Sequence, residues 1–425
     1  MRYTDPRCGL ARHRRIQEHD VKWSISRGSG IPRNVRLLGW ASCLNDVASE
    51  MIYPLLPMFL TSVLHGSRFY LGVIEGLGES VACLLKLWAG ARSDRVGQRK
   101  AFVVSGYAVS AVARPRSAVA TIPAHLFGLR IIDRIGKGTR TAPRDAMIAD
   151  STLPALRGLA FGFHRAMDHL GAAAGPLLAA ALLAMWPDRL RLVFGLTLVP
   201  GVLVVVLLVW GLRETTAGQS TTTPIPRTLR PPDARFRRLL LAVLVFALGN
   251  SSDAFLLLRA GDLGISTAQL PLLWFGFHVA KSAGNLLVGR LVDRVGPQPL
   301  LVAGWLVYAA VYFGFAIATS AWQMVALFGS YALYYALAEP SEKTLVAALA
   351  GPTQRGQAFG WYHLALGAGA LPASVVFGAI YDAWGPTRAF GVGAILAGVA
   401  IGLLCTVQLS SGASDPCAEP DRDVP

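Results

Sequence analysis

The chain has 425 residues, of which 53% are hydrophobic and only 15% are charged. Soluble domains carry about 25% charged residues, so this composition excludes an ordinary soluble protein. The formal net charge of +15 does not indicate nucleic-acid binding, because the cations lie in short loops and in the N-terminal arm, where the orientation of membrane spans explains them. Apolar runs of about 20 residues recur along the whole length and predict an all-α membrane protein.

The N-terminal arm, residues 1–34, is basic and polar, and no apolar run follows it until about Val35, so we expect no cleavable signal peptide. Two interpretations stay open: a disordered cytoplasmic tail or an over-long start. The arm, the loop 92–100 and the central linker are all basic. By the positive-inside rule, both termini are predicted to be cytoplasmic.

We predict twelve transmembrane helices in two pseudo-symmetric six-helix bundles. In the first bundle, residues 35–213, the spans lie near 36–63, 69–91, 101–120, 124–147, 158–184 and 191–212. In the second bundle, residues 238–409, they lie near 238–260, 268–291, 298–318, 321–349, 357–381 and 387–409. A cytoplasmic linker rich in Thr, Pro and Arg, residues 214–237, joins the bundles, and residues 410–425 form a cytoplasmic tail.

The loops after the second and eighth spans repeat the pattern G-x-x-x-D-R-V-G, 199 residues apart. Further matches include Asn45-Asp46 with Ser252-Asp253, and Arg157-Gly158 followed by His164 with Arg355-Gly356 followed by His363. A duplicated loop between hydrophobic hairpins indicates a duplicated membrane domain, with a cavity between the halves near the bilayer midplane.

The first loop resembles the signature between helices 2 and 3 of the major facilitator superfamily, G-x-L-A-D-R-x-G-R-K, and the resemblance covers roughly residues 35–410. It implies the fold of that superfamily and transport by alternating access. It also implies that Asp94 docks near Gln357–Phe359 and favours an outward-open state. The alternative is that these charges only set the topology. The residues assigned to conformational gating are Gly90, Asp94, Arg95, Gly97, Arg99, Asp293 and Arg294.

Polar side chains inside the predicted spans are the candidates for proton coupling or for the substrate cavity, because hydrocarbon disfavours them elsewhere. They are Asn45, Asp46, Glu50, Glu75, Glu79, Arg114, Arg130, Asp133, His164, Asp168, Asp253, Lys281 and Glu339. Burial and a neighbouring acid both favour a protonated carboxyl group. Asp46 is the first choice for coupling because Asp253 matches it in the second half. The alternative is that these acids neutralise Arg114, Arg130 or Lys281.

The predicted fourth span places Arg130, Arg134 and Lys137 along one side, and Asp133 can pair with Arg130 or Lys137. It resembles the family's helix-4 motif R-x-x-Q-G-x-G, which implies that Arg130 faces the cavity and takes part in proton coupling or anion binding. The remaining cations of this span are expected to form a self-neutralised cluster at its cytoplasmic end. They are Lys137, Arg140 and Arg144.

Two further positions keep alternatives open. Arg114 either fixes an anionic substrate or an acid such as Glu75, or lies with Arg116 at the outer surface. An unperturbed histidine titrates near neutral pH, so His164 could relay protons, but a lone histidine is more often structural. In the second half, Lys281 is the expected substrate contact, and the spacing of Glu339 and Lys343 predicts that they pair with each other.

Small residues in the predicted fifth span, Gly171 and Gly175, allow tight helix packing and precede Pro176. This break resembles the family's antiporter motif in helix 5 and favours export. The leading hypothesis is therefore proton-coupled export of a drug or metabolite, and the alternative is proton-coupled uptake of an anionic metabolite. A membrane receptor or enzyme is the second class, and a pore is the third, although no nucleophile–base pair stands out.

We expect a monomer of the cell inner membrane, embedded in the lipid bilayer, that binds a small-molecule substrate and protons. We expect no cofactor, no metal and no nucleic acid, because the five cysteines have no metal-ligand spacing and the chain has no complete phosphate-binding loop.

Overall fold

The computed structural model describes residues 30–65, 68–186, 189–215, 231, 233–251, 253–265 and 269–407. Nearly all of the predicted arm, most of the linker and the whole tail therefore lie outside the described residues, as does the side chain of Glu75. Residues Pro32–Val407 form one contact unit, which includes both predicted bundles.

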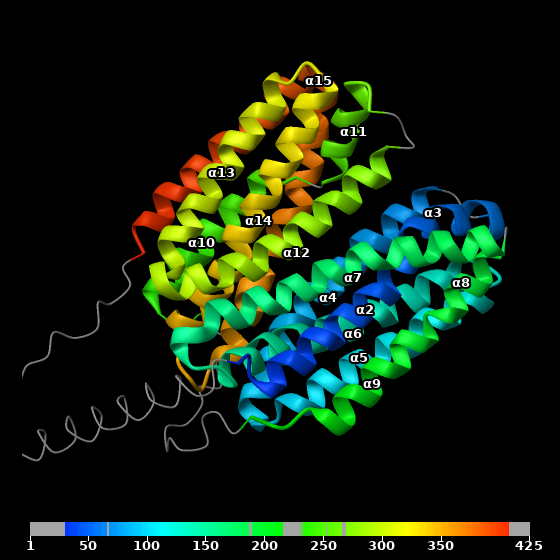
Figure 1. Ribbon diagram of the computed structural model, residues 1–425, viewed down its shortest axis with the longest axis horizontal. Coiled ribbons are helices and arrows are strands. Elements are labelled where there is room, and N and C mark those ends of the chain that lie inside the picture. The colour runs from blue at the N-terminus through cyan, green and yellow to red at the C-terminus, as the bar shows by residue number, and fades with distance from the viewer. Residues whose placement is uncertain are drawn as a thin grey trace, which may run out of the picture. The chain divides into compact units, whose positions relative to one another are not determined.

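Every regular element within the described ranges is helical (Figure 1). Before the linker, the helices are α2 (Arg33–Ile52), α3 (Leu56–Met58), α4 (Arg68–Val96), α5 (Arg99–Arg116), α6 (Pro123–Asp150), α7 (Arg157–Met185), α8 (Leu190–Leu196) and α9 (Leu198–Gly211). After it, they are α10 (Ala234–Gly249), α11 (Ala254–Asp262), α12 (Leu270–Val295), α13 (Pro297–Ile317), α14 (Ala321–Leu349) and α15 (Arg355–Cys405). The prediction of an all-α protein is confirmed.

Several helix breaks fall at proline or glycine. The first predicted span changes from α2 into short turns after Ile52, where Pro54 and Pro57 follow. The helix α15 covers the last two predicted spans and is broken at Gly385, whose φ of +82° precedes Pro386. The number of membrane crossings stays a prediction.

Five helices of the described part are long and apolar enough to cross a membrane: Pro154–Met185, Leu190–Gly211, Pro297–Ile317, Arg355–Trp384 and Pro386–Cys405. Other long helices, such as α6, carry many charged side chains, which lower their hydropathy. Those charges are largely buried, whereas large apolar side chains such as Trp210, Leu287 and Trp322 are exposed. An apolar outside around a polar inside is the distribution that a bilayer favours.

The helices before the linker pack mainly with one another, as do those after it. In the first set, α2 packs against α7 and α9, and α6 packs against α4 and α5. In the second set, α13 and α12 pack against α14, and α10 packs against α15. Two extensive contacts join the sets, α7 with α12 and α4 with α15, and α7 and α12 run side by side in Figure 1.

Glycines permit these crossings between the two sets. A Cβ atom on Gly90 of α4 would lie 2.1 Å from the carbonyl oxygen of Gly356 in α15. A Cβ atom on Gly158 of α7 would lie 2.5 Å from the carbonyl oxygen of Gly289 in α12. Both glycines are therefore needed because backbone meets backbone at these points.

Candidate functional site

A cavity of about 970 Å³ lies among α2, α4, α5, α6, α7, α14 and α15. Its described lining includes five acidic residues and nine Lys or Arg residues, so it has an excess of positive charge. The acids are Asp46, Glu50, Glu79, Asp133 and Asp168. The cations are Lys86, Arg114, Arg130, Arg134, Lys137, Arg140, Arg144, Arg165 and Lys343.

Arg114 is buried in this cavity rather than at the outer surface. Its Nη1 donates to the backbone oxygen and to Oδ1 of Asn45, at 2.8 and 2.9 Å. Its Nε lies 3.0 Å from Oδ1 of Asp133, and Nη1 of Arg130 lies 3.6 Å from Oδ2 of Asp133. Arg116 is exposed. The structure therefore decides between the two interpretations of Arg114, and Asp133 serves as a shared counter-ion.

Glu79 is the centre of a second charge cluster. Its carboxylate lies 3.0 Å from Lys86, 3.3 Å from Lys137 and 3.5 Å from Arg134. Lys86 is not among the site residues predicted from the sequence. The sequence spacing could have predicted this contact, because Lys86 lies seven residues, or about two turns, after Glu79 and therefore on the same face of α4.

Lys137, Arg140 and Arg144 line the cavity, which corrects their predicted place at the cytoplasmic end. Arg140 donates to Oγ of Ser110 at 2.7 Å and its guanidinium lies 4.5 Å from the ring centre of Tyr107. The reason is that α6 continues to Asp150. Lys137 is thus about 20 Å from the helix end at 1.5 Å per residue.

Asp46 and Glu50 also line the cavity, but they differ from the other acids. Oδ1 of Asp46 accepts a hydrogen bond from Nδ2 of Asn45 at 2.9 Å. Among the described side chains, no cation lies within ion-pair distance of either carboxylate. A proton can therefore bind to Asp46 or Glu50 without breaking an ion pair. Glu79, Asp133 and Asp168, by contrast, each form an ion pair with a Lys or Arg side chain.

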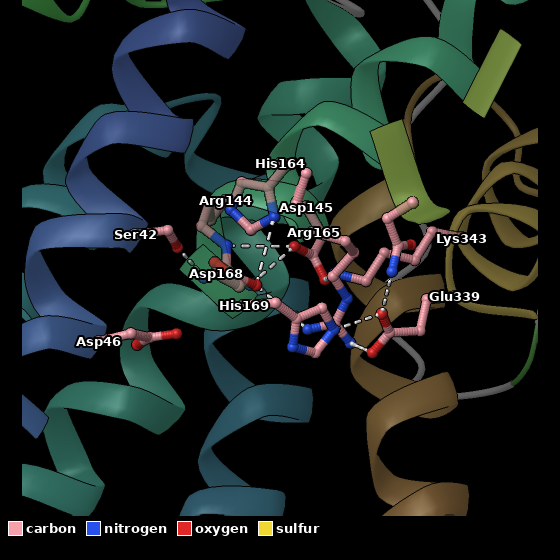
Figure 2. Close-up of polar contacts among 12 residues, drawn as sticks. Ser42, Asp46, Arg144, Asp145, His164, Arg165, Asp168, His169, Glu339 and Lys343 are labelled. Carbon is pink, nitrogen blue, oxygen red and sulfur yellow. Dashed lines mark hydrogen bonds and ion pairs between the residues drawn. The ribbon is translucent and has the colours of Figure 1, made fainter. Parts of the chain in front are cut away.

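Between the two sets of helices lies a network of charged side chains (Figure 2). Oδ2 of Asp145 in α6 lies 2.9 Å from Lys343 of α14 and 2.9 Å from His363 of α15. Glu339 of α14 lies 2.8 Å from His169 of α7. The predicted pair between Glu339 and Lys343 is therefore wrong, because each side chain finds a partner of opposite charge across the interface.

Several predicted residues do not line this cavity: His164, Asp253, Lys281 and Glu339. Asp253 accepts hydrogen bonds from Tyr331 at 3.0 Å and from Tyr335 at 3.3 Å. The ammonium of Lys281 lies 3.4 Å from the ring centre of Tyr335. Two aromatic rings of the second bundle, those of Phe277 and Tyr335, thus pack against the ammonium of Lys281, and its role as the substrate contact stays a prediction. His164 is fully buried, 3.6 Å from Asp168.

The two repeated loops make equivalent contacts. Asp94 accepts hydrogen bonds from the backbone N–H groups of Gly356 and Gln357, at 3.0 and 2.7 Å. Asp293 accepts them from Gly158 and Leu159, at 2.6 and 2.8 Å. Each carboxylate therefore caps the start of a helix in the opposite half, where free N–H groups and the helix dipole favour negative charge.

We call these two contacts, Asp94 with the start of α15 and Asp293 with the start of α7, the docks, and the end of the bundles where they lie the docked end. In the described part of the chain, ion pairs of further charged side chains reinforce only the dock at Asp94. Arg99 bridges Asp94 and Asp150, at 2.9 and 2.7 Å, and Arg355 also pairs with Asp150. Arg95 and Arg294, which were assigned to gating, are exposed. Gly97 has a φ of +67° and allows the turn that brings Arg99 back to Asp94.

We predict that Asp94→Asn separates this end of the bundles more than Asp293→Asn does. The first substitution removes a buried partner of Arg99, which costs about 3 kcal/mol, and the second weakens two hydrogen bonds only. The distance between spin labels at the exposed positions 92 and 352 measures the separation, in a background without native cysteines. Equal effects of the two variants would contradict a special role for Arg99.

The remaining predicted packing residues lie within the first set of helices. A Cβ atom on Gly171 would lie 2.3 Å from the carbonyl oxygen of Cys43, and one on Gly175 would lie 2.8 Å from that of Val47. Pro176 continues the same helix, α7. This stretch thus brings the backbone of α7 against α2 at Cys43, Val47 and Glu50.

Comparisons with known proteins identify the family. Residues 38–259 and 239–418 match the model of the Major Facilitator Superfamily, so the chain belongs to that superfamily of transporters and is not an enzyme. An uncharacterized MFS-type transporter of Methanocaldococcus jannaschii is 30% identical over 390 residues, which cover 90% of this chain and 97% of the relative. The multidrug resistance protein MdtH of Cronobacter sakazakii is 25% identical over 362 residues, covering 81% and 88%.

A solved structure shares the fold. The human organic anion transporter MFSD10 superposes with a TM-score of 0.74 at 19% sequence identity, covering 88% of this chain and 99% of the other. At this identity the likeness concerns the fold alone. The predicted superfamily and its fold are therefore confirmed, and the chain is a multi-pass membrane transporter of a small molecule.

Proposed function

We propose that this protein carries a small organic anion across the cell inner membrane together with protons. The observation that carries the proposal is the lining of the cavity, in which nine Lys or Arg residues face five acids. A water-filled site with excess positive charge attracts anions and repels cations. The sequence-based alternative, uptake of an anionic metabolite, is thus favoured over export of an unspecified drug.

Protons are proposed to bind at Asp46 and Glu50, since these acids of the lining are free of ion pairs with described cations. Protonation removes one negative charge from the cavity and therefore strengthens the binding of an anion. By reciprocity, a bound anion strengthens the binding of the proton. The two species then travel in the same direction, which is symport, and an inward proton gradient drives uptake.

The transport step is proposed to be alternating access, with Asp94 and Asp293 holding one end of the bundles closed. Along α4, Glu79 of the cavity precedes Asp94 by 15 residues, or about 22 Å. The lining reaches from Lys86, eight residues or about 12 Å before Asp94 on α4, to Tyr53 at the opposite end of α2. We propose that the docked end faces the cytoplasm, as the basic loops indicate, and that the cavity faces outward.

Proton-coupled export is the second candidate. It is supported by the close contact of Gly171 and Gly175 with α2, which corresponds to the antiporter-like break, and by the similarity to a multidrug resistance protein. In that case substrate binding and proton binding would compete at Asp46. Opposite directions of substrate and proton movement would then distinguish export from uptake.

The charge of the cavity can be tested before a substrate is known, because Cys83 lines it. We expect an anionic methanethiosulfonate (the sulfonatoethyl reagent) to modify Cys83 about tenfold faster than the cationic trimethylammonium reagent, after each rate is divided by that for a free thiol. The Cys83→Ser variant gives the background from other cysteines. Preference for the cationic reagent would contradict an anion site.

A further inference from the structure

The charges that line the cavity are distributed very unequally between the two sets of helices. Every Asp, Glu and Arg of the lining belongs to α2, α4, α5, α6 or α7. In the described lining, the helices after the linker contribute one cation, Lys343, and one histidine, His363. A bound anion can therefore form an ion pair with the second set of helices at Lys343.

Lys343 is buried, with 1% of its surface exposed, and its counter-ion comes from the other set of helices. Its ammonium lies 2.9 Å from Oδ2 of Asp145, although without the geometry of a hydrogen bond. Asp145 is fully buried and is shared, because Arg144 donates to Oδ1 at 3.1 Å and His363 lies 2.9 Å from Oδ2. One carboxylate thus serves three basic side chains.

One turn earlier on α14, Glu339 makes the reverse connection. It lies 2.8 Å from His169 and 3.5 Å from Arg165 of α7. Figure 2 shows that Lys343 and Glu339 project from the same side of their helix towards these partners. Two ion-pair links of opposite polarity therefore join α14 to the first set of helices, and of Lys343 and Glu339 only Lys343 lines the cavity.

We propose that the anionic group of the transported molecule binds Lys343 and replaces Asp145 as its counter-ion. The proposal rests on the anion cavity inferred above and names its contact in the second set of helices. After the exchange, Asp145 keeps Arg144 and His363, and Lys343 keeps a negative partner. The link from α6 to α14 is then released without leaving a buried charge uncompensated, so the loaded carrier changes conformation more readily than the empty one.

The test uses inorganic phosphate and succinate as probes, with neutral succinamide as the control, at constant ionic strength. We expect the two anions to stabilise the purified wild-type protein against heat in a concentration-dependent way, as ligands of the native state do. Lys343→Met should lose this effect, and Lys343→Arg should restore it. Lys281→Met is the matched control, because Lys281 is a buried lysine outside the cavity lining, and it should keep the effect.

Asp145→Asn separates counter-ion exchange from a purely structural ion pair. Removal of the competing carboxylate should lower the half-maximal anion concentration about tenfold, opposite in sign to Lys343→Met. If both variants weaken anion binding equally, the pair is structural and the proposal is wrong. If Lys343→Met keeps full anion stabilisation, this proposal fails and the anion cavity stands. If neither anion stabilises the wild type, the anion cavity itself is contradicted.

Discussion

Asp133→Asn is expected to lower the free energy of unfolding by about 3 kcal/mol, because it leaves buried cations without their shared carboxylate. Arg114 lies 3.0 Å and Arg130 3.6 Å from Asp133, and the three side chains are at most 7% exposed. An asparagine can accept one hydrogen bond but cannot compensate the charges. Unfolding of the purified protein, followed by heat or denaturant in detergent, measures the loss.

Asp46→Asn is the matched control for this prediction. It makes the same chemical change in the same cavity, but at a carboxylate without an ion pair to a described cation. Its effect on stability should stay below about 1 kcal/mol. If the two substitutions destabilise the protein equally, the distinction between paired and unpaired acids, on which the proposed coupling sites depend, is incorrect.

Gly90→Ala is expected to prevent closure of the docked end of the bundles. The new Cβ atom would lie 2.1 Å from the carbonyl oxygen and 2.7 Å from the carbonyl carbon of Gly356. Backbone atoms cannot rotate away as a side chain can, so α4 and α15 must separate. The N–H groups that donate hydrogen bonds to Asp94 then move away together with Gly356. In inside-out vesicles, Cys83 should react at least tenfold faster with a membrane-impermeant thiol reagent than in the wild type.

Gly128→Ala is the control for this substitution, because a Cβ atom at Gly128 of α6 meets nothing within 4 Å. It should leave the rate at Cys83 unchanged. A Gly90→Ala protein that labels at the wild-type rate and transports normally would show that the crossing at Gly90 does not have to close during the cycle.

The resemblance of the first loop to the superfamily signature implied that Asp94 docks near Gln357–Phe359, and Asp94 accepts a hydrogen bond from the N–H group of Gln357. The pattern around Asp94 and Asp293 recurs with the matching helix starts at Gly158 and Gly356, and a carboxylate next to free backbone N–H groups needs no particular side-chain partner. The all-α fold could also be predicted from the sequence, because long apolar runs in a bilayer must satisfy their own backbone hydrogen bonds.

It was harder to predict which polar residues line the cavity, because this depends on how each helix is rotated about its axis relative to its neighbours. Lys281 and Lys343 look alike in sequence, yet aromatic rings enclose the first and the cavity reaches the second. The i, i+4 rule predicted that Glu339 would pair with Lys343, but stronger partners were available across the interface. Contacts between residues about 200 positions apart leave no local signal.

The measurement that tests the central claim most directly is substrate-driven proton movement. The purified protein is reconstituted in liposomes with a trapped pH dye, and pools of anionic, neutral and cationic metabolites are added outside. We predict that an anionic pool acidifies the lumen with the wild-type protein. With Asp46→Asn we predict no acidification, although anion counterflow continues. Anion entry without any proton flux, or a response confined to cationic pools, would contradict proton-coupled anion transport.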